Sequence, residues 1–279
     1  MKSTFAFRAL FLIAQYSLAT AQQTLKTLNI VAHQDDDLLF LSPDLLHNVH
    51  GGAGLRTIFL TAGDAGNDWA YWNGRQAGSL AAYAQMAGVA NEWTESDSGA
   101  PDTDIPVYTL NGRSDISLAF LQLPDGGLDG TGWESTHHVS LLQLWNGDLE
   151  SIETLTGSTS YTKDKLLSTL AWLIEDFDPL RINTMDYVND VNIDFDHPDH
   201  SVTGFFADNA ERQSTSSAEL VGYLGYSTKD RTPNVGGDDL QQKQDTFFFY
   251  AGYDPGTCNS VQTCSGRPEL EWLSRSYIL

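Results

Sequence analysis

Short apolar runs followed by helix-like segments most constrain the fold of this chain. Leu28–Ala32 (LNIVA), Leu55–Ala62 (LRTIFLTA) and Ser117–Leu123 are typical of strands that are buried on both faces. Lys163–Phe177 repeats apolar residues at helical spacing, and the Ala-rich stretch Gln76–Gly88 favours a second helix. Strands that alternate with helices predict a sheet with right-handed crossovers. The sequence therefore predicts an α/β fold, a single three-layer αβα Rossmann-like domain with a mostly parallel sheet.

Weaker patterns predict the remaining elements. Asn111-Gly112 marks a turn, and His197-Pro198 marks the start of a helix because proline suits the first helical position. No internal repeat or change in composition divides the chain, so we expect one domain over residues 22–279. The expected elements also include strands at Val107–Leu110, Arg181–Tyr187 and Thr246–Ala251, and a turn and helix over Asp35–His47.

The first 21 residues predict a secretory signal peptide. Lys2 and Arg8 provide a positive start, Ala9–Ala14 is apolar, and Ala19-Thr20-Ala21 forms a small-x-small cleavage signal before Gln22. A structural N-terminal helix is the alternative. The apolar run is too short to span a bilayer, and no later stretch is apolar enough to do so. We therefore expect a secreted, extracellular protein without a membrane span.

The charge balance excludes two classes of partner. The chain has 15 basic and 37 acidic residues, a net charge of −22. Cleavage of the signal peptide removes two basic residues and no acidic ones, so the mature charge is 13 − 37 = −24. A chain this acidic repels nucleic acid and anionic lipid surfaces. We expect no nucleic-acid partner, and nothing in the sequence predicts a protein partner.

Only two cysteines are present, Cys258 and Cys264, in a Gly/Thr/Ser-rich stretch near the C-terminus. A single pair in a secreted domain predicts a disulfide that closes a small loop. A structural zinc site is disfavoured because the C-x5-C spacing lacks the further ligands that such a site needs.

Two polar clusters carry the chemistry of the chain. His33-Gln34-Asp35-Asp36-Asp37 follows the first predicted strand, and Asp196-His197-Pro198-Asp199-His200 follows a later one. The C-terminal ends of parallel strands meet at the edge of the sheet where α/β proteins bind ligands. Each cluster alone is also compatible with a polar helix start. Neighbouring carboxylates, however, are costly unless they share a cation or a proton.

Taken together, the clusters predict a catalytic metal site. His33, Asp36 and His200 form a set of two histidines and one carboxylate, which leaves coordination positions open for water or substrate. Asp35 remains free to take a proton from a water molecule. His197 remains free to stabilise negative charge or to protonate a leaving amine. These parts suit metal-assisted hydrolysis.

The two clusters resemble the paired signatures of the PIG-L/LmbE-like zinc deacetylase family. Those signatures usually read Ala-His-Pro-Asp-Asp-Glu and, well downstream, His-Pro-Asp-His. Thr61–Gly66 resembles the family's Thr-x-Gly loop, and Arg75 resembles the arginine of its next segment. The resemblance covers roughly Leu28 to Ala210. It implies one Zn²⁺ per chain, or another divalent transition metal. The roles it implies are metal ligation by His33, Asp36 and His200, general-base catalysis by Asp35, stabilisation of the tetrahedral intermediate by His197, orientation of that imidazole by Asp199, and substrate contact by Asp64 and Arg75.

Two further features have open interpretations. Asp125, in Leu123–Gly127, is either a loop residue or a group that contacts a sugar. Trp69, Tyr71 and Trp72 either stack on a sugar ring or belong to the core or the rim of the site.

The function that the sequence predicts is removal of an N-acetyl group from an N-acetylglucosamine-containing glycoconjugate or oligosaccharide. A metallo-hydrolase that cleaves another amide or an ester is one alternative. A secreted carbohydrate-binding protein with a silent site is another, because Gln34, Asp37 and Phe195 depart from the usual signatures. A dehydrogenase is disfavoured because the first strand is not followed by Gly-x-Gly-x-x-Gly.

Overall fold

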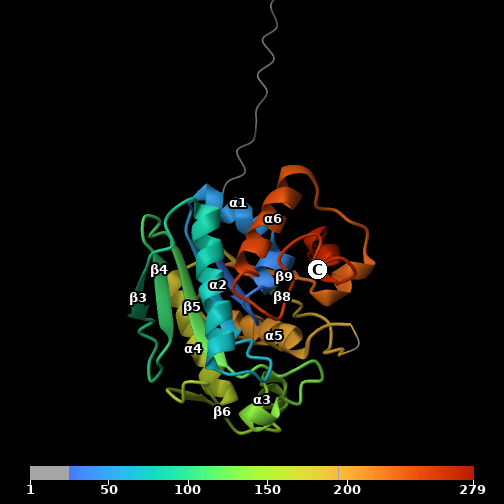
Figure 1. The fold of residues 1–279 in the computed structure, drawn as a ribbon. Helices are drawn as coiled ribbons and strands as arrows, with labels where there is room; N and C mark the ends of the chain where they lie inside the picture. The colour runs from blue at the N-terminus through green and yellow to red at the C-terminus, as the bar shows by residue number, and fades with distance from the viewer. Residues whose placement is uncertain (1–24, 194) are drawn as a thin grey trace, which may run out of the picture.

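A computed structural model describes residues 25–193 and 195–279 of the chain. The predicted signal peptide, residues 1–21, lies outside the described residues. A seven-stranded sheet with the order β3-β4-β5-β2-β1-β8-β9 forms the centre of the molecule (Figure 1). Within the described part of the chain, no helix has both the length and the apolar character needed to cross a bilayer.

Five neighbouring strands of the sheet run parallel, and β4 is antiparallel to both β5 and β3. The mostly parallel sheet predicted from the sequence is therefore confirmed. The strands are β1 (Thr27–Val31), β2 (Leu55–Thr61), β3 (Trp93–Asp97), β4 (Pro106–Leu110), β5 (Ile116–Leu123), β8 (Arg181–Met185) and β9 (Glu219–Tyr223), with a separate small pair, β6 (Ile152–Glu153) and β7 (Ser160–Tyr161).

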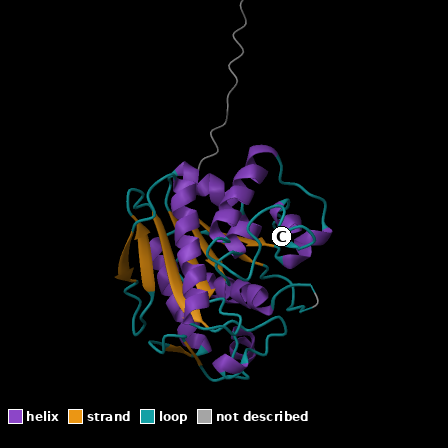
Figure 2. Ribbon diagram, viewed as in Figure 1, coloured by secondary structure: helices purple, strands orange, loops and turns teal. Residues whose placement is uncertain are grey.

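Helices cover both faces of the sheet, as Figure 2 shows. Separate apolar cores lie on the two faces, one containing Leu170 and Phe206 and the other Tyr83 and Phe247, so the predicted three-layer architecture is confirmed. The first core packs α4 (Lys163–Phe177) and α5 (Pro198–Gln213), and the second packs α1 (Asp44–Gly51), α2 (Trp69–Ala87) and α6 (Gly237–Tyr250). Shorter helices are η1 (Asp37–Leu41), η2 (Glu134–Thr136), α3 (Leu141–Asn146), η3 (Tyr226–Asp230) and α7 (Glu269–Leu273).

The prediction of a strand at Thr246–Ala251 is wrong, because this segment forms the end of α6. Phe247 and Tyr250 are both fully buried and lie three residues apart, whereas Phe249 is 46% exposed. That spacing is helical rather than alternating, and a short apolar run does not distinguish the two. The helix expected over Asp35–His47 is divided into η1 and α1, with Pro43 between them.

A chain of buried polar side chains crosses the sheet beneath α2. Asn183 Nδ2 donates to Asn29 Oδ1 at 3.0 Å, and Asn29 Nδ2 donates to Thr57 Oγ1 at 3.1 Å. Thr57 Oγ1 lies 2.5 Å from the hydroxyl of Tyr83, which in turn donates to Asp37 Oδ2. Buried polar groups destabilise a fold unless they are hydrogen-bonded, and here each is paired with the next. The chain thus connects strands β8, β1 and β2 to the segment that follows β1.

We expect Asn29→Ala to lower the free energy of unfolding by about 1–3 kcal/mol, because the amide of Asn183 and the hydroxyl of Thr57 each lose one hydrogen bond in a buried site. Urea denaturation measures this effect. Asn146→Ala, at an exposed position at the end of α3, serves as the control and is expected to change stability by less than about 0.5 kcal/mol. Equal stability of the two variants would contradict a supporting role for the chain.

Candidate active site

The two polar clusters meet at the C-terminal ends of neighbouring strands. β1 pairs with β2 on one side and with β8 on the other, so the chain changes direction across the sheet between β1 and β8. Crevices at such a switch point are the usual ligand sites of open α/β sheets. Here a cavity of about 460 Å³ is lined by residues of both clusters, among them His33, Asp35, Asp36 and His197.

His33, Asp36 and His200, which we call the metal trio, are all buried. His33 Nδ1 lies 3.4 Å from Asp36 Oδ2, and His200 Nε2 lies 3.0 Å from Asp36 Oδ1. The ligand atoms of the three residues all lie within 4.8 Å of one another. The structure therefore brings together the three residues that the sequence suggested as ligands.

A carboxylate holds the second nitrogen of each histidine in the trio. His33 Nε2 lies 3.3 Å from Asp199 Oδ2, and His200 Nδ1 lies 2.7 Å from Asp196 Oδ1. Donation of these N–H groups leaves the lone pairs of His33 Nδ1 and His200 Nε2 available to a ligand. Carboxylates in this position are the common outer partners of metal-bound histidines.

The trio fits a divalent cation. His200 Nε2 is buried and has no hydrogen-bond partner among the described residues, since its close approach to Asp36 lacks hydrogen-bond geometry. Burial alone lowers the pKa of His200, but the charges of Asp36 and Asp196 raise it to about 10. The site therefore favours positive charge at the point where the ligand atoms converge. Two imidazoles and one carboxylate suit Zn²⁺ and other divalent transition metals.

A second group of possible ligands overlaps the first. Asp125, His197 and Asp199 lie near His33 Nε2 with their ligand atoms within 4.8 Å of one another. Asp199 Oδ2, however, already accepts from the backbone N–H of Gly126 at 2.9 Å and lies within hydrogen-bond distance of His33 Nε2. In the metal trio Asp36 Oδ2 accepts from the backbone N–H of His33 at 2.6 Å, but among the described residues His200 Nε2 has no hydrogen-bond partner and Asp36 Oδ1 accepts no hydrogen bond. The metal trio is therefore the better site.

Asp35 lies at the edge of the cavity and pairs with Arg75. Its Oδ1 accepts from Arg75 Nη2 at 2.6 Å, while its Oδ2 accepts no hydrogen bond within the described part of the chain. Burial raises the pKa of Asp35, and the charge of Arg75 opposes that rise. Asp35 thus keeps one oxygen free beside the metal trio.

Arg75 makes contacts with the protein through all three of its nitrogens. Nε donates to the hydroxyl of Tyr250 at 2.9 Å and lies 3.0 Å from Asp254 Oδ2, and Nη1 donates to the carbonyl of Gly63 at 2.6 Å. A side chain at position 63 is excluded, because a Cβ there would lie 2.3 Å from Arg75 Nη1 and φ is +56°. Arg75, suggested as a substrate contact, is thus placed where it holds Asp35.

His197 caps the N-terminus of α5 with its imidazole. Its Nδ1 accepts from the backbone N–H of Asp199 at 3.2 Å, so the neutral ring carries its proton on Nε2. Burial, with the charge of His33 acting in the same direction, lowers the pKa of His197 to about 4. The side chain lines the cavity and is therefore a neutral N–H donor near pH 7. Asp199 contacts both histidines, His197 through its backbone and His33 through its carboxylate.

Asp64 and Asp125, both suggested as substrate contacts, lie at different depths. Asp64 is fully buried and is not part of the cavity lining, and its carboxylate accepts from the backbone N–H groups of Asp125 and Gly66. Asp125 lines the cavity, where its Oδ2 lies 3.5 Å from His33 Nε2 and its Oδ1 accepts from Trp133 Nε1 at 3.2 Å.

Of the three aromatic residues near the start of α2, only Tyr71 lines the cavity. Trp72 is buried, and Trp69 is 63% exposed. Tyr71 therefore lies at the site, Trp72 in the core and Trp69 at the surface.

The departures from the usual signatures leave the metal trio intact. Gln34 Nε2 donates to the carbonyl of Thr61 at 2.9 Å, which ties the segment after β1 to the end of β2. Asp37 accepts from Tyr83, and burial raises its pKa to about 8. Phe195 is 60% exposed and does not line the cavity.

Asp196 and Asp254 also support the site, although the sequence does not predict a role for either. Asp196 lies four residues before His200, a helical spacing that could have revealed it. Asp254 contacts Arg75 from a distant part of the chain and follows no local pattern.

We expect Asp196→Asn to weaken metal affinity by about 10- to 100-fold, the usual effect of losing an outer carboxylate partner of a metal-bound histidine. Competition with a chromogenic chelator measures the affinity. Asp190→Asn, at an exposed position before α5, provides a matched control. Unchanged affinity in the Asp196 variant would show that the carboxylate does not orient His200.

Comparisons with known proteins gave a family match and several distant structural likenesses. A search of curated proteins returned no match. Among solved structures, the 4-carboxy-2-hydroxymuconate hydratase GalB of Pseudomonas putida KT2440 is 12% identical, with a TM-score of 0.48 and coverage of 88% of this chain and 82% of that chain. The N,N'-diacetylchitobiose deacetylase of Pyrococcus horikoshii is 15% identical (TM-score 0.45; 86% and 75% covered), and the teicoplanin deacetylase Orf2 is 14% identical (TM-score 0.43; 81% and 84%).

These structural likenesses are too distant to bear on function. The family model described as PIG-L, GlcNAc-PI de-N-acetylase, matches residues 28–211. That segment runs from β1 through α5 and contains the metal trio, Asp35, His197 and Asp199. With well over half of its length matched, the chain belongs to the PIG-L family.

Proposed function

We propose that this protein is a secreted, metal-dependent N-deacetylase that releases acetate from an N-acetylglucosamine-containing glycoconjugate or oligosaccharide. Family membership supports a deacetylase, and the metal trio supports metal dependence. The observation that carries the proposal is that Asp35, with one free carboxylate oxygen, lines the same cavity as His33 and Asp36 of the trio and the neutral His197. Secretion is supported by the sequence of residues 1–21.

The side chains divide the hydrolysis between them. A divalent ion held by His33, Asp36 and His200 would polarise the amide carbonyl and acidify water. Asp35 Oδ2 would take the proton from the water that attacks the carbonyl carbon. His197 Nε2–H would donate to the oxyanion as it forms, an interaction typically worth about 3 kcal/mol. The C–N bond would then break, and the amine would leave with the proton that Asp35 had accepted.

Product analysis tests this proposal. Purified, metal-loaded protein is incubated with N-acetylglucosamine oligomers, and both acetate and free amine are quantified. We expect the two products in equal amounts. Saccharide binding without acetate release would instead favour a silent binding protein, and cleavage confined to ester or peptide substrates would favour a different metallo-hydrolase.

A further inference from the structure

Much of the cavity wall comes from residues beyond position 211, where the family match ends. Most of these wall residues follow α6 and lie before or within α7. They include Asp254, Gly256, Thr257, Arg267, Glu269 and Trp272. We refer to residues 254–269 as the C-terminal wall.

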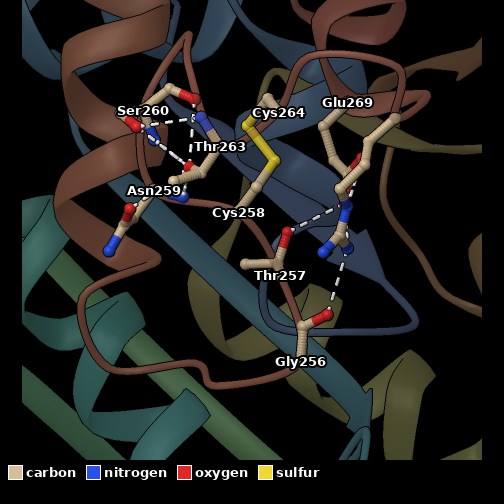
Figure 3. The surroundings of a disulfide bond; sticks show 9 residues. Gly256, Thr257, Cys258, Asn259, Ser260, Thr263, Cys264 and Glu269 are labelled. Carbon is tan, nitrogen blue, oxygen red and sulfur yellow. Dashed lines mark hydrogen bonds and ion pairs between the residues drawn. A yellow bond between two sulfur atoms is a disulfide. The ribbon is translucent and has the colours of Figure 1, made fainter.

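The predicted disulfide is confirmed, and it joins the two halves of this wall. Cys258 and Cys264 are bonded, with their Cα atoms 5.1 Å apart. Gly256 and Thr257 precede the bond in the chain, and Arg267 and Glu269 follow it. Figure 3 shows Thr257 and Glu269 close to the disulfide. Inside the closed loop, Thr263 Oγ1 accepts from the backbone N–H groups of Asn259 and Ser260, so the loop is also hydrogen-bonded internally.

A fixed polar cluster forms the surface of the wall. Glu269 is only 5% exposed and accepts from Arg267 Nη2 at 2.5 Å and from Thr257 Oγ1 at 3.1 Å. Arg267 Nη2 also donates to the carbonyl of Gly256 at 3.1 Å. Within the described residues, Arg267 Nη1 donates no hydrogen bond, and the Arg267 side chain is 42% exposed. The wall therefore offers the N–H donors of Arg267, and the positive charge of this guanidinium is already balanced by Glu269.

The wall is also fixed relative to the proposed base. Asp254 Oδ1 accepts from the backbone N–H of Gly256 at 2.8 Å, and Asp254 Oδ2 lies 3.0 Å from Arg75 Nε. Arg75 in turn holds Asp35 at 2.6 Å. A substrate whose acetamide group lies at Asp35 would therefore have the wall at a defined place in the same cavity.

Charge indicates what the wall can bind. The described residues that line the cavity include five carboxylates, from Asp35, Asp36, Asp125, Asp254 and Glu269, against two arginines, Arg75 and Arg267, both already paired. An anionic group would be repelled there. Trp133, 38% exposed, adds an aromatic surface of the kind that packs against a sugar ring. The lining suits a neutral, hydroxyl-rich group.

We propose that the C-terminal wall binds the sugar unit next to the one that is deacetylated, so that the protein prefers a neutral oligosaccharide to a monosaccharide. This inference rests on the proposed function. Arg267 Nη1 donates to a sugar oxygen, Glu269 holds the guanidinium and is itself held by Thr257, and the disulfide keeps the two halves of the wall together.

Substrate preference tests the inference. The ratio of kcat/KM for the β-linked disaccharide of N-acetylglucosamine to that for the monosaccharide is compared between wild type and Arg267→Ala. We expect the ratio to fall about tenfold, the effect of losing one charge-assisted hydrogen bond, mainly through a higher KM for the disaccharide. Thr257→Val and the double variant Cys258→Ser/Cys264→Ser are expected to lower the ratio without loss of bound metal.

Arg212→Ala is the matched control, because Arg212 forms an exposed pair with Asp208 on α5, away from the cavity lining, and it is expected to keep the wild-type ratio. A general loss of stability would lower kcat for both substrates and leave the ratio unchanged.

Calorimetric titration of the two saccharides separates failure of this inference from failure of the proposed function. One outcome is that no acetate is released, but wild type binds the disaccharide more tightly than the monosaccharide and Arg267→Ala loses that difference. In that case the inference about the wall stands and the proposed deacetylase function fails. If acetate is released and the ratio is the same in wild type, Arg267→Ala and Thr257→Val, the inference is overturned and the proposed function stands. A wild type without preference in turnover or binding also overturns it.

Discussion

Asp35→Asn is expected to lower the rate of acetate release by about 100- to 10,000-fold while the protein keeps its metal, because an amide cannot take a proton from the attacking water. The metal trio does not include Asp35, and Arg75 retains its contacts with Tyr250 and Asp254 in this variant. The loss should therefore appear in kcat. Metal content by mass spectrometry and acetate release by an enzyme-coupled assay measure the two properties on the same preparation.

Asp148→Asn, at an exposed position after α3, provides the control for this substitution and is expected to behave as wild type. Full activity in metal-loaded Asp35→Asn protein would contradict the assignment of Asp35 as the base. Loss of metal together with activity would show instead that Asp35 supports the ion.

His200→Gln is expected to remove tight metal binding and reduce acetate release to background. It deletes a ligand atom, whereas Asp196→Asn only frees the ring from its partner. Metal binding should also be visible without turnover. A ligand that binds only the folded state raises the melting temperature, so Zn²⁺ added to metal-free wild type should raise Tm and should leave that of His200→Gln unchanged.

His50→Gln, on the exposed face of α1, is the matched control and should retain the Zn²⁺-dependent rise in Tm. Normal metal affinity in His200→Gln would exclude the metal trio as the metal site. It would instead favour the overlapping group that contains Asp125, His197 and Asp199.

The residues that meet at the edge of the sheet could be predicted from the sequence because the relevant signals are local. His33, Asp35 and Asp36 follow a buried strand directly, and His197 and His200 open a helix with its proline at the first position. Parallel strands place such segments at one edge of the sheet, so sequence position alone brings the two clusters together.

The contacts that complete the site could not be predicted in this way. Arg75 meets the hydroxyl of Tyr250 across 175 residues of sequence, and Asp254 reaches Arg75 from the same distant region. Neither contact produces a periodic pattern. The sequence predicts a strand for the aromatic run around Phe247, but a few apolar residues suit either a strand or a buried helix, and tertiary packing decides between them.

Metal reconstitution tests the central claim, metal-dependent deacetylation, most directly. The mature protein is stripped with chelator, Zn²⁺ is added back in substoichiometric steps, and acetate release from an N-acetylglucosamine oligomer is followed at each step. We expect activity to rise in proportion to added Zn²⁺ and to reach a plateau at about one equivalent per chain, the stoichiometry of a single three-ligand site. Acetate release that persists in fully stripped protein, or that does not respond to Zn²⁺ and other divalent transition metals, would contradict the account.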